Sequence, residues 1–276
     1  MSFKIVSDSS SNVFKFSGVD FESVPLKIIT AKKEYVDDKN LDVETMVNEI
    51  RETKGKSGTS CPNIGDWLRA FGDAENIFAI TITSKLSGSY ASAEQAAKIH
   101  EEAHPGANVF VIDSLSTGGE MRLIIEFIRE CILGGKSFEE IREDVKSYQE
   151  RTKLLFSLQS LTNLARNGRV SPAVAKIAGV LGIRVLGAAK DGVLDPLHKI
   201  RGEAKTMEKM FEEMKERGDQ GGKVRIDHCL NLGAAEMLKE KILGEFPKSD
   251  IVIGENGGLC SFYAERGGLI VGYESV

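Results

Sequence analysis

The sequence predicts an α/β protein made of two α/β domains, the first built on a mostly parallel sheet that helices cover. Three observations carry this prediction: short apolar runs typical of buried strands, longer helix-like stretches between them, and glycine pairs or capping residues where those stretches begin or end. A chain of 276 residues allows one large or two modest domains and a sizeable core. We place the boundary near Thr152, so that the domains span residues 1–152 and 153–276.

In the first half, predicted strands and helices alternate along the chain. Apolar runs predict buried strands at residues 3–6, 77–82 and 108–112. Helices are predicted at residues 43–53, 64–71, 88–100 and 120–133, the last of them ending at a glycine pair. A further helix begins at Ser137, because Ser137 and Glu140 have the spacing of a capping box. This alternation favours a parallel sheet.

The second half begins with an apolar run at residues 154–158. Further strands are predicted at residues 183–186, 193–195, 223–227, 251–254 and 269–273. Helices are predicted at residues 171–180, 203–217 and 234–243. Glycine pairs such as Gly257-Gly258 are interpreted as turns, because the spacing of a dinucleotide fingerprint and the Lys-Ser/Thr of a P-loop are absent.

A hydroxyl-rich loop, Thr83 to Tyr90, joins the predicted strand 77–82 to a predicted helix. Backbone N–H groups are unpaired at such a junction and the helix dipole is positive there, so the loop suits an anion. Ser87 and Ser89 add side-chain donors, and Gly88 permits the close approach of a ligand. The alternative is that Ser87 or Ser89 only caps the helix.

Three more segments repeat this pattern. They are residues 6–12 after the first strand, 58–63 before the helix at 64–71, and 111–119 after the strand at 108–112. Pro62 is predicted to open the helix at 64–71, in which case Thr59 and Ser60 could be ordinary caps. Parallel sheets bind ligands outside the carboxyl ends of their strands. We therefore expect four hydroxyl-rich loops to meet on one edge of one sheet and to hold an anionic group with neutral donors.

The order and spacing of these motifs resemble one protein family along nearly the whole chain. The motifs are Ile5-Val6-Ser7-Asp8-Ser9-Ser10, Val24-Pro25-Leu26, Thr59-Ser60-Cys61-Pro62, Leu86-Ser87-Gly88-Ser89-Tyr90, Val111-Ile112-Asp113-Ser114, Leu161-Thr162-Asn163-Leu164 and Asn167-Gly168-Arg169-Val170. Together they resemble the DegV family, the fatty-acid-binding proteins also called FakB. At the level of the family, Asp8 is expected to order its own loop, as an Asx-type cap does.

The resemblance implies a long-chain fatty acid buried near the domain interface. Its carboxylate would be held by Thr59 and Ser87, in loops that also contain Ser60, Gly88 and Ser89. A separate ATP-dependent fatty acid kinase subunit would phosphorylate that carboxylate, so the protein itself would be a non-catalytic lipid-binding module. It would need no cofactor other than the bound fatty acid.

One departure from the family concerns a histidine that approaches the carboxylate. Without gaps, its position falls on Ala264, and Tyr263 or Arg266 could supply a donor instead. The basic residues Arg201 and Arg169, with Arg266, are candidates for contact with a phosphate or a partner, because guanidinium groups match phosphate oxygens. The alternative is a solvated or ion-paired arginine. His228 is a further candidate for contact with a phosphate or a partner. The alternative is that His228 has only a structural role.

The charge and the cysteine content limit the other functions that the protein could have. The 36 Lys and Arg residues and 41 Asp and Glu residues give a net charge of −5, so no nucleic-acid partner is expected. The cysteines are scattered, without metal or redox spacing. Neither a signal peptide nor a membrane-spanning apolar run is found, so we expect a cytoplasmic protein with at most peripheral membrane contact. The alternative functions are an acyl hydrolase that uses Ser87, with His228 as base, and a lipid-sensing regulator without a kinase.

Overall fold

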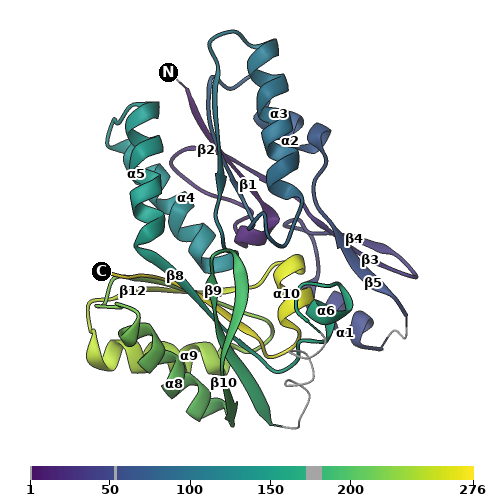
Figure 1. The fold of residues 1–276 in the computed structure, drawn as a ribbon, viewed down its shortest axis with the longest axis vertical. Helices are drawn as coiled ribbons and strands as arrows, with labels where there is room; N and C mark the ends of the chain where they lie inside the picture. Colours follow the sequence, from purple (N-terminus) through teal and green to yellow (C-terminus); the bar gives the residue numbers. More distant parts are fainter. Residues whose placement is uncertain (1, 53–54, 172–181) are drawn as a thin grey trace.

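A computed structural model describes residues 2–52, 55–171 and 182–276 of the chain (Figure 1). Three sheets organise it, and each draws its strands from one part of the sequence. The sheets are called A, B and C below. Two of them come from the first 113 residues, whereas every strand of sheet C lies within residues 152–274.

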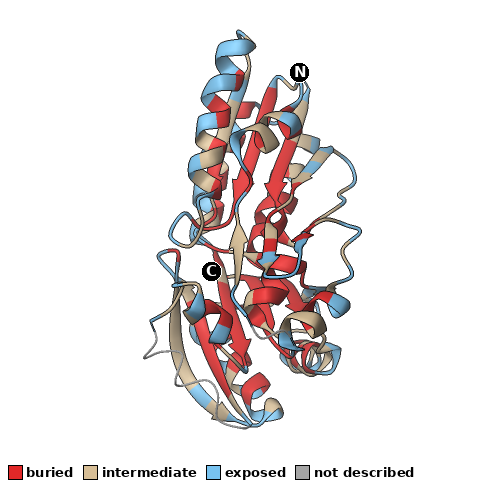
Figure 2. Ribbon diagram, turned by 90° about the vertical axis from the view of Figure 1, so that its right-hand side faces the viewer, coloured by how far each residue is buried: buried red, intermediate tan, exposed pale blue. Residues whose placement is uncertain are grey.

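Sheet A is entirely parallel, as predicted for the first half. Its strand order is β2-β1-β6-β7, and the strands span Asp20–Val24, Phe3–Asp8, Asn76–Thr81 and Asn108–Asp113. The three predicted strands are confirmed with ends shifted by up to two residues, and β2 is an addition. All six residues of the central strand β6 are buried, because helices cover both faces of the sheet (Figure 2).

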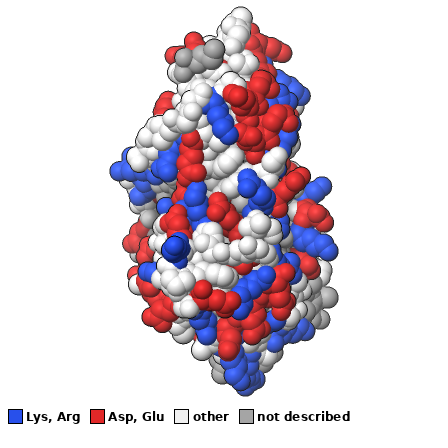
Figure 3. Space-filling view, turned by 90° about the vertical axis from the view of Figure 1, so that its left-hand side faces the viewer, with Lys and Arg blue, Asp and Glu red and all other residues white. Residues whose placement is uncertain are grey.

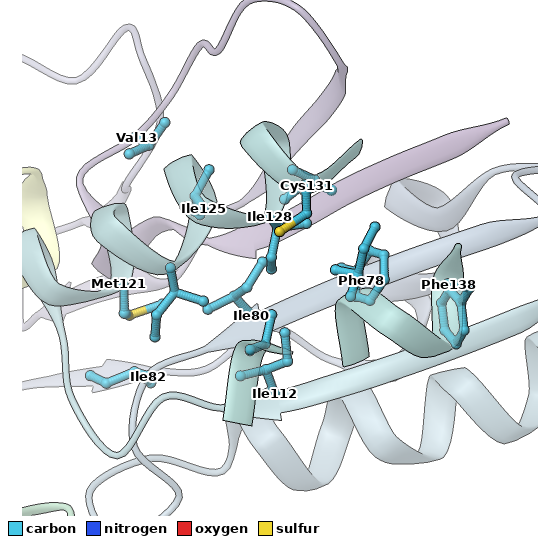
Figure 4. Close-up of a cluster of buried hydrophobic side chains, with 14 of the residues drawn as sticks. Val13, Phe78, Ile80, Ile82, Ile112, Met121, Ile125, Ile128, Cys131 and Phe138 are labelled. Atoms are coloured by element: carbon cyan, nitrogen blue, oxygen red, sulfur yellow. The ribbon is translucent and has the colours of Figure 1, made fainter. Parts of the chain in front are cut away.

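The two faces of sheet A pack against different helices. On one face, Phe78 and Ile80 contact α4 (Gly118–Leu133) and α5 (Phe138–Glu150), and the rings of Phe78 and Phe138 stack with centroids 4.7 Å apart (Figure 4). On the other face, Ile77 and Ala79 join the cluster formed by α2 (Ile64–Phe71) and α3 (Ser89–Ala103). Successive side chains of β6 point to opposite faces of the sheet, so this strand contributes to two hydrophobic clusters.

Sheet B is a small antiparallel sheet that the sequence analysis did not predict. Its order is β4-β3-β5, with strands at Glu34–Val36, Lys27–Thr30 and Ser57–Ser60. Thr59 and Ser60 thus lie in a strand, and only three of the four hydroxyl-rich segments meet at the edge of sheet A. The expectation that all four would share one sheet edge is wrong. Helix α1 (Val43–Glu52) lies between β4 and β5 in the chain.

Sheet C is mixed and mainly antiparallel. Its order is β10-β9-β8-β13-β11-β12, so β13 (Leu269–Glu274) occupies an inner position although it follows every other strand in the chain. The other strands are β8 (Thr152–Leu158), β9 (Ile183–Lys190), β10 (Val193–Arg201), β11 (Lys223–His228) and β12 (Asp250–Glu255). Only β11 and β12 pair in parallel.

Two helices cover one face of sheet C, and the start of α4 lies against the other face together with two short helices. Helices α8 (Glu203–Glu216) and α9 (Leu232–Glu245) cover the first face, close to their predicted positions. On the other face lie α6 (Thr162–Arg166) and α10 (Gly258–Ala264). The helix predicted at residues 171–180 falls almost wholly outside the described residues.

Helix starts show which capping predictions hold. The capping box at Ser137 and Glu140 is confirmed. Pro62 does not open α2, because Asn63 is its N-cap and forms a capping box with Asp66, with Asn63 Oδ1 accepting from the Asp66 N–H at 3.0 Å. Thr59 and Ser60 are therefore not caps. The N-cap of α3 is Gly88, which has no side chain to offer.

The surface carries charges of both signs. On the face in Figure 3, Lys and Arg side chains are interspersed with Asp and Glu. Ion pairs of this kind include Lys136 with Asp144 at 2.6 Å and Lys223 with Glu130 at 2.7 Å. None of the described helices is long and apolar enough to pass through a bilayer.

Candidate ligand-binding cavity

A cavity of about 280 Å³ lies between the loops at the edge of sheet A and one face of sheet C. Most of its wall is apolar. The wall includes Leu26, Ile82, Leu154, Phe156, Leu158, Leu164, Leu259 and Ile270. No histidine, aspartate or glutamate is among the described residues that line it. The shape and lining are those of a site for an apolar molecule rather than for acid–base chemistry.

The polar part of the wall contains four of the residues predicted for carboxylate binding. Thr59 and Ser60 come from β5, and Ser87 and Gly88 come from the loop before α3. The two segments adjoin, since a Cβ placed on Gly88 would lie 3.2 Å from the Sγ of Cys61. Ser87 is half-buried and Gly88 is exposed, as are Leu115 and Val193 of the wall, whereas Phe156 is buried. The polar groups therefore lie on the solvent side of the cavity, and its deep side is the face of sheet C.

Ser89 has a different role from the one predicted. It is fully buried, and its Oγ donates to Asp8 Oδ2 at 2.7 Å. Asp8 also accepts from the Ile82 N–H at 2.9 Å and the Ser10 N–H at 3.2 Å, so the expectation that Asp8 orders its own loop is confirmed. Burial raises the pKa of Asp8, and these hydrogen bonds oppose that effect. Ser89 thereby fixes the start of α3 next to Ser87.

Tyr263 completes the polar end of the cavity. Its Oη lies 2.8 Å from Thr59 Oγ1, and it lines the cavity together with Cys260 and Ala264 of the same helix, α10. Tyr263 was one of two donors suggested for the position of the missing histidine. The structure brings Tyr263 to Thr59, while Arg266, the other suggestion, points away to Asn48 Oδ1 at 3.3 Å.

Asp37, which the sequence analysis did not single out, anchors α10. Its buried carboxylate accepts from the Gly258 N–H at 2.5 Å, the Leu259 N–H at 2.9 Å and the Ser9 hydroxyl at 2.8 Å. Burial raises the pKa of Asp37 to about 6, although all three hydrogen bonds lower it. The sequence contained one sign of this close contact, the glycine pair Gly257-Gly258. A side chain at Gly258 would crowd the carboxylate, because its Cβ would lie 3.0 Å from Asp37 Oδ1.

A second buried carboxylate joins the two halves of the chain. Asp227, at the end of β11, accepts from Asn12 Nδ2 at 2.8 Å, and Asn12 also accepts from the Gly257 N–H at 2.8 Å. Asn12 has a φ of +58°, which asparagine tolerates better than most residues. Burial raises the pKa of Asp227 to about 6.

The basic candidates lie at different distances from the cavity. Arg169 lines it, and its Nε donates to the Leu86 carbonyl at 3.2 Å. Arg201 is exposed at the end of β10, away from the cavity wall. Arg266 lines a separate groove of about 1140 Å³. His228 is buried at the end of β11, where burial lowers its pKa and its Nδ1 accepts from the Asn231 N–H at 3.3 Å.

The tip of the β9–β10 hairpin closes the cavity from the C-terminal half. Gly192 and Val193 line the wall, and the Thr83 hydroxyl donates to the Gly192 carbonyl at 2.8 Å. Gly192 has a φ of +81°, and a Cβ there would lie 2.9 Å from Lys85 Cγ, so only glycine fits without rearrangement. The two halves are thus in direct contact around the cavity.

The fold and the cavity together define an α/β protein with a mainly apolar cavity between its two halves. The family model described as "Uncharacterised protein, DegV family" matches residues 2–275. The chain therefore belongs to the DegV family, and the resemblance seen in the sequence is confirmed.

Relatives and solved structures match along the full length. A DegV domain-containing protein of Streptococcus pneumoniae is 42% identical over 279 residues, with 99% of each chain covered. A DegV family protein from Eubacterium eligens, solved with heptadecanoic acid, is 43% identical with a TM-score of 0.98 and full coverage of both chains. The Streptococcus pneumoniae Fatty Acid Kinase B3 protein, solved with linoleic acid, is 42% identical with a TM-score of 0.98 and the same coverage. These structures confirm the predicted fold class.

Proposed function

We propose that this protein binds one long-chain fatty acid, with the carboxylate between Thr59 and Ser87 and the acyl chain in the apolar part of the cavity. The observation that carries the proposal is that both hydroxyl groups line one cavity whose wall is mainly apolar. The ligands of the two similar solved structures, heptadecanoic acid and linoleic acid, support it. Both are apolar chains that end in one carboxylate.

Tyr263 is the third group of the proposed carboxylate site. Its hydroxyl is already hydrogen-bonded to Thr59, so the pair can present one O–H to the ligand while the other is held in place. A hydrogen bond to a charged group contributes roughly 1.5–3 kcal/mol. Neutral hydroxyls of this kind bind a carboxylate without forming an ion pair with it, which leaves the carboxylate oxygens available for reaction.

We further propose that the bound carboxylate is presented to a separate ATP-dependent fatty acid kinase, as the name of the Streptococcus pneumoniae relative suggests. The position of the polar end near solvent supports this, since a partner must reach the carboxylate. Arg169 is the cation in the cavity wall, and Arg201 and Arg266 are exposed for contact with the partner. Acyl-phosphate formation from the loaded protein, ATP and a kinase subunit tests this step.

The lipid-binding proposal is tested by extracting the purified protein with organic solvent and measuring fatty acids by mass spectrometry. Thr59→Ala combined with Ser87→Ala should weaken fatty acid binding at least tenfold while the fold persists. Ser84→Ala is the matched control, because Ser84 is exposed in the same loop and does not line the cavity. Equal affinity of the double variant and the control would contradict the carboxylate assignment.

The acyl hydrolase alternative lacks support from the lining. Ser87 would need a general base within hydrogen-bond reach, and His228 is buried elsewhere. Release of fatty acid from acyl esters that Ser87→Ala abolishes would favour the hydrolase. A protein that binds lipid but supports no phosphorylation would instead favour the lipid-sensing regulator.

A further inference from the structure

One face of sheet C forms the apolar floor of the cavity. Along β8, Leu154, Phe156 and Leu158 all line the cavity, whereas Leu155 points to the opposite face and joins the cluster of α8 and α9. This alternation follows from the period of two along a strand. The floor is therefore built from every second residue, and Phe156, in its middle, is the only aromatic group that β8 contributes to it.

Phe156 lies in a hollow that a glycine provides. In the register of β8 and β9, Phe156 is opposite Gly187, and paired residues share one face of the sheet. A Cβ built on Gly187 would lie 2.7 Å from Phe156 Cε2, so the ring covers the Cα of Gly187. Only the absence of a side chain at Gly187 lets the ring lie this close to the backbone.

The hollow is rigid. The same Cβ would also lie 2.7 Å from the carbonyl oxygen of Asp195 on β10, next to the register shift between Pro196 and His198. Two groups from two different strands therefore close on Gly187. The ring has the backbone beneath it and the cavity on its other side, and its distance from the sheet is fixed by contact rather than by a flexible neighbour.

We propose that Phe156, seated over Gly187, determines the length and shape of the acyl chain that the cavity accepts. This inference rests on the proposed function. Apolar pockets distinguish chains by what their walls exclude, and one methylene that fits or clashes changes affinity about 10- to 200-fold. The other groups that β8, β9 and β13 contribute to the floor are aliphatic, namely Leu154, Leu158, Ala189 and Ile270. Removal of the ring opens the floor down to the bare backbone of Gly187.

The test is competition between fatty acids. Phe156→Ala and wild-type protein are each loaded from an equimolar mixture of saturated fatty acids of graded length and their cis-unsaturated counterparts. Bound lipid is extracted and quantified by mass spectrometry. We expect the ratio of longer or bent chains to the chain that wild type prefers to rise about tenfold or more in Phe156→Ala. Phe156→Leu, which removes less volume and is the safer variant for folding, should shift the ratio in the same direction by less.

Leu155→Ala is the matched control. Leu155 is fully buried and is the next residue of the same strand, so its truncation also creates a cavity, but on the face away from the lipid. A shift in chain preference seen with Phe156 variants and not with Leu155→Ala supports the inference. The same preference in all folded variants overturns it while leaving the proposed function intact. If wild type takes up none of the fatty acids, the proposed function fails and the inference with it.

Discussion

The edge of sheet A and the face of sheet C contribute to the same cavity in opposite ways. At the carboxyl edge of a parallel sheet each strand gives way to a loop, and the loop from Thr83 to Gly88 brings hydroxyl groups to the cavity. The N–H groups of Thr83 to Ser87 are already hydrogen-bonded within the protein, so the expectation of unpaired N–H groups there is wrong for these residues. On the face of sheet C the backbone groups are paired within the sheet, and only side chains such as Phe156 reach the cavity. The difference in polarity between the two ends follows from the side chains that each contributes, hydroxyl groups from the loop and β5 and apolar groups from sheet C.

Helix α10 is neither part of the edge of sheet A nor part of the face of sheet C. It comes from the C-terminal half of the chain, yet it completes the polar end of the cavity. It carries Tyr263 to Thr59, and it is held there by Asp37, which is 221 residues away from Gly258 in the sequence. The buried carboxylate of Asp37 is therefore one of the anchors on which the polar end depends, beside Asn12 at the Gly257 N–H. Substitutions at this helix and at the contacts around it therefore test how the polar end is assembled.

The largest effect is expected for Asp37→Ala. The substitution leaves the N–H groups of Gly258 and Leu259 and the Ser9 hydroxyl without their acceptor, and each buried unsatisfied group costs roughly 1–3 kcal/mol. We expect the free energy of unfolding in urea to fall by about 3 kcal/mol and fatty acid binding to weaken. The control is Asp38→Ala, since Asp38 accepts from Asn40 N–H in an exposed turn. An equal loss of unfolding free energy in both variants would show that Asp37 does not anchor α10.

The second expectation concerns the contact between Asn12 and Asp227, where the two halves meet. Burial raises the folded-state pKa of Asp227 from 3.8 to about 6, so the folded protein takes up a proton more readily than the unfolded chain. The resulting stabilisation is complete below about pH 4 and is lost as the pH rises through about 6. Relative to wild type, Asp227→Asn should therefore gain roughly 2–3 kcal/mol of unfolding free energy between about pH 4 and about pH 7.

Urea unfolding at a series of pH values measures this difference. Asp20→Asn is the control, because the Asp20 side chain is 66% exposed. A constant difference between wild type and Asp227→Asn across the pH range would mean that Asp227 does not titrate in this window.

The smallest effect is expected for Tyr263→Phe, which removes one hydroxyl and leaves the ring in place. Loss of the hydrogen bond to Thr59 should weaken fatty acid binding about fivefold, equivalent to about 1 kcal/mol, with little change in stability. Affinity is measured by displacement of a fluorescent fatty acid. Tyr273→Phe is the matched control: its hydroxyl is buried without a hydrogen-bond partner in the described structure and lies outside the cavity. Indistinguishable affinities would remove Tyr263 from the proposed carboxylate site.

Sequence reasoning succeeded where local pattern determines structure. Buried strands such as Asn76–Thr81 and the capping box at Ser137 depend on neighbouring residues, and both were predicted. The short strand Ser57–Ser60 was missed because it has no apolar alternation and exists through pairing with β3. β9 and β10 were predicted too short, because Gly187 and Pro196 interrupt the apolar pattern; Pro196 is tolerated on the edge strand β10.

The residues of the candidate site also differ in whether a local sequence pattern could identify them. Thr59 and Ser87 were identified because each belongs to a short motif, and the structure brings both to one cavity. Tyr263 could only be suggested, since the direction of its side chain depends on how a seven-residue helix is anchored by Asp37. The role of Gly187 could not be predicted at all, because it depends on a cross-strand neighbour whose register is not encoded locally.

The inner position of β13 determines when sheet C can be completed during synthesis of the chain. A ribosome makes the chain from its N-terminus, and domains generally fold as they emerge. Sheet C cannot close until Leu269–Glu274 inserts between β8 and β11, and the polar end of the cavity is incomplete until Gly258–Ala264 has been made. A nascent chain that already contains Thr59, Ser87 and the whole of sheet A therefore still has no closed cavity. The cavity is therefore completed in one late step rather than growing with the length of the chain.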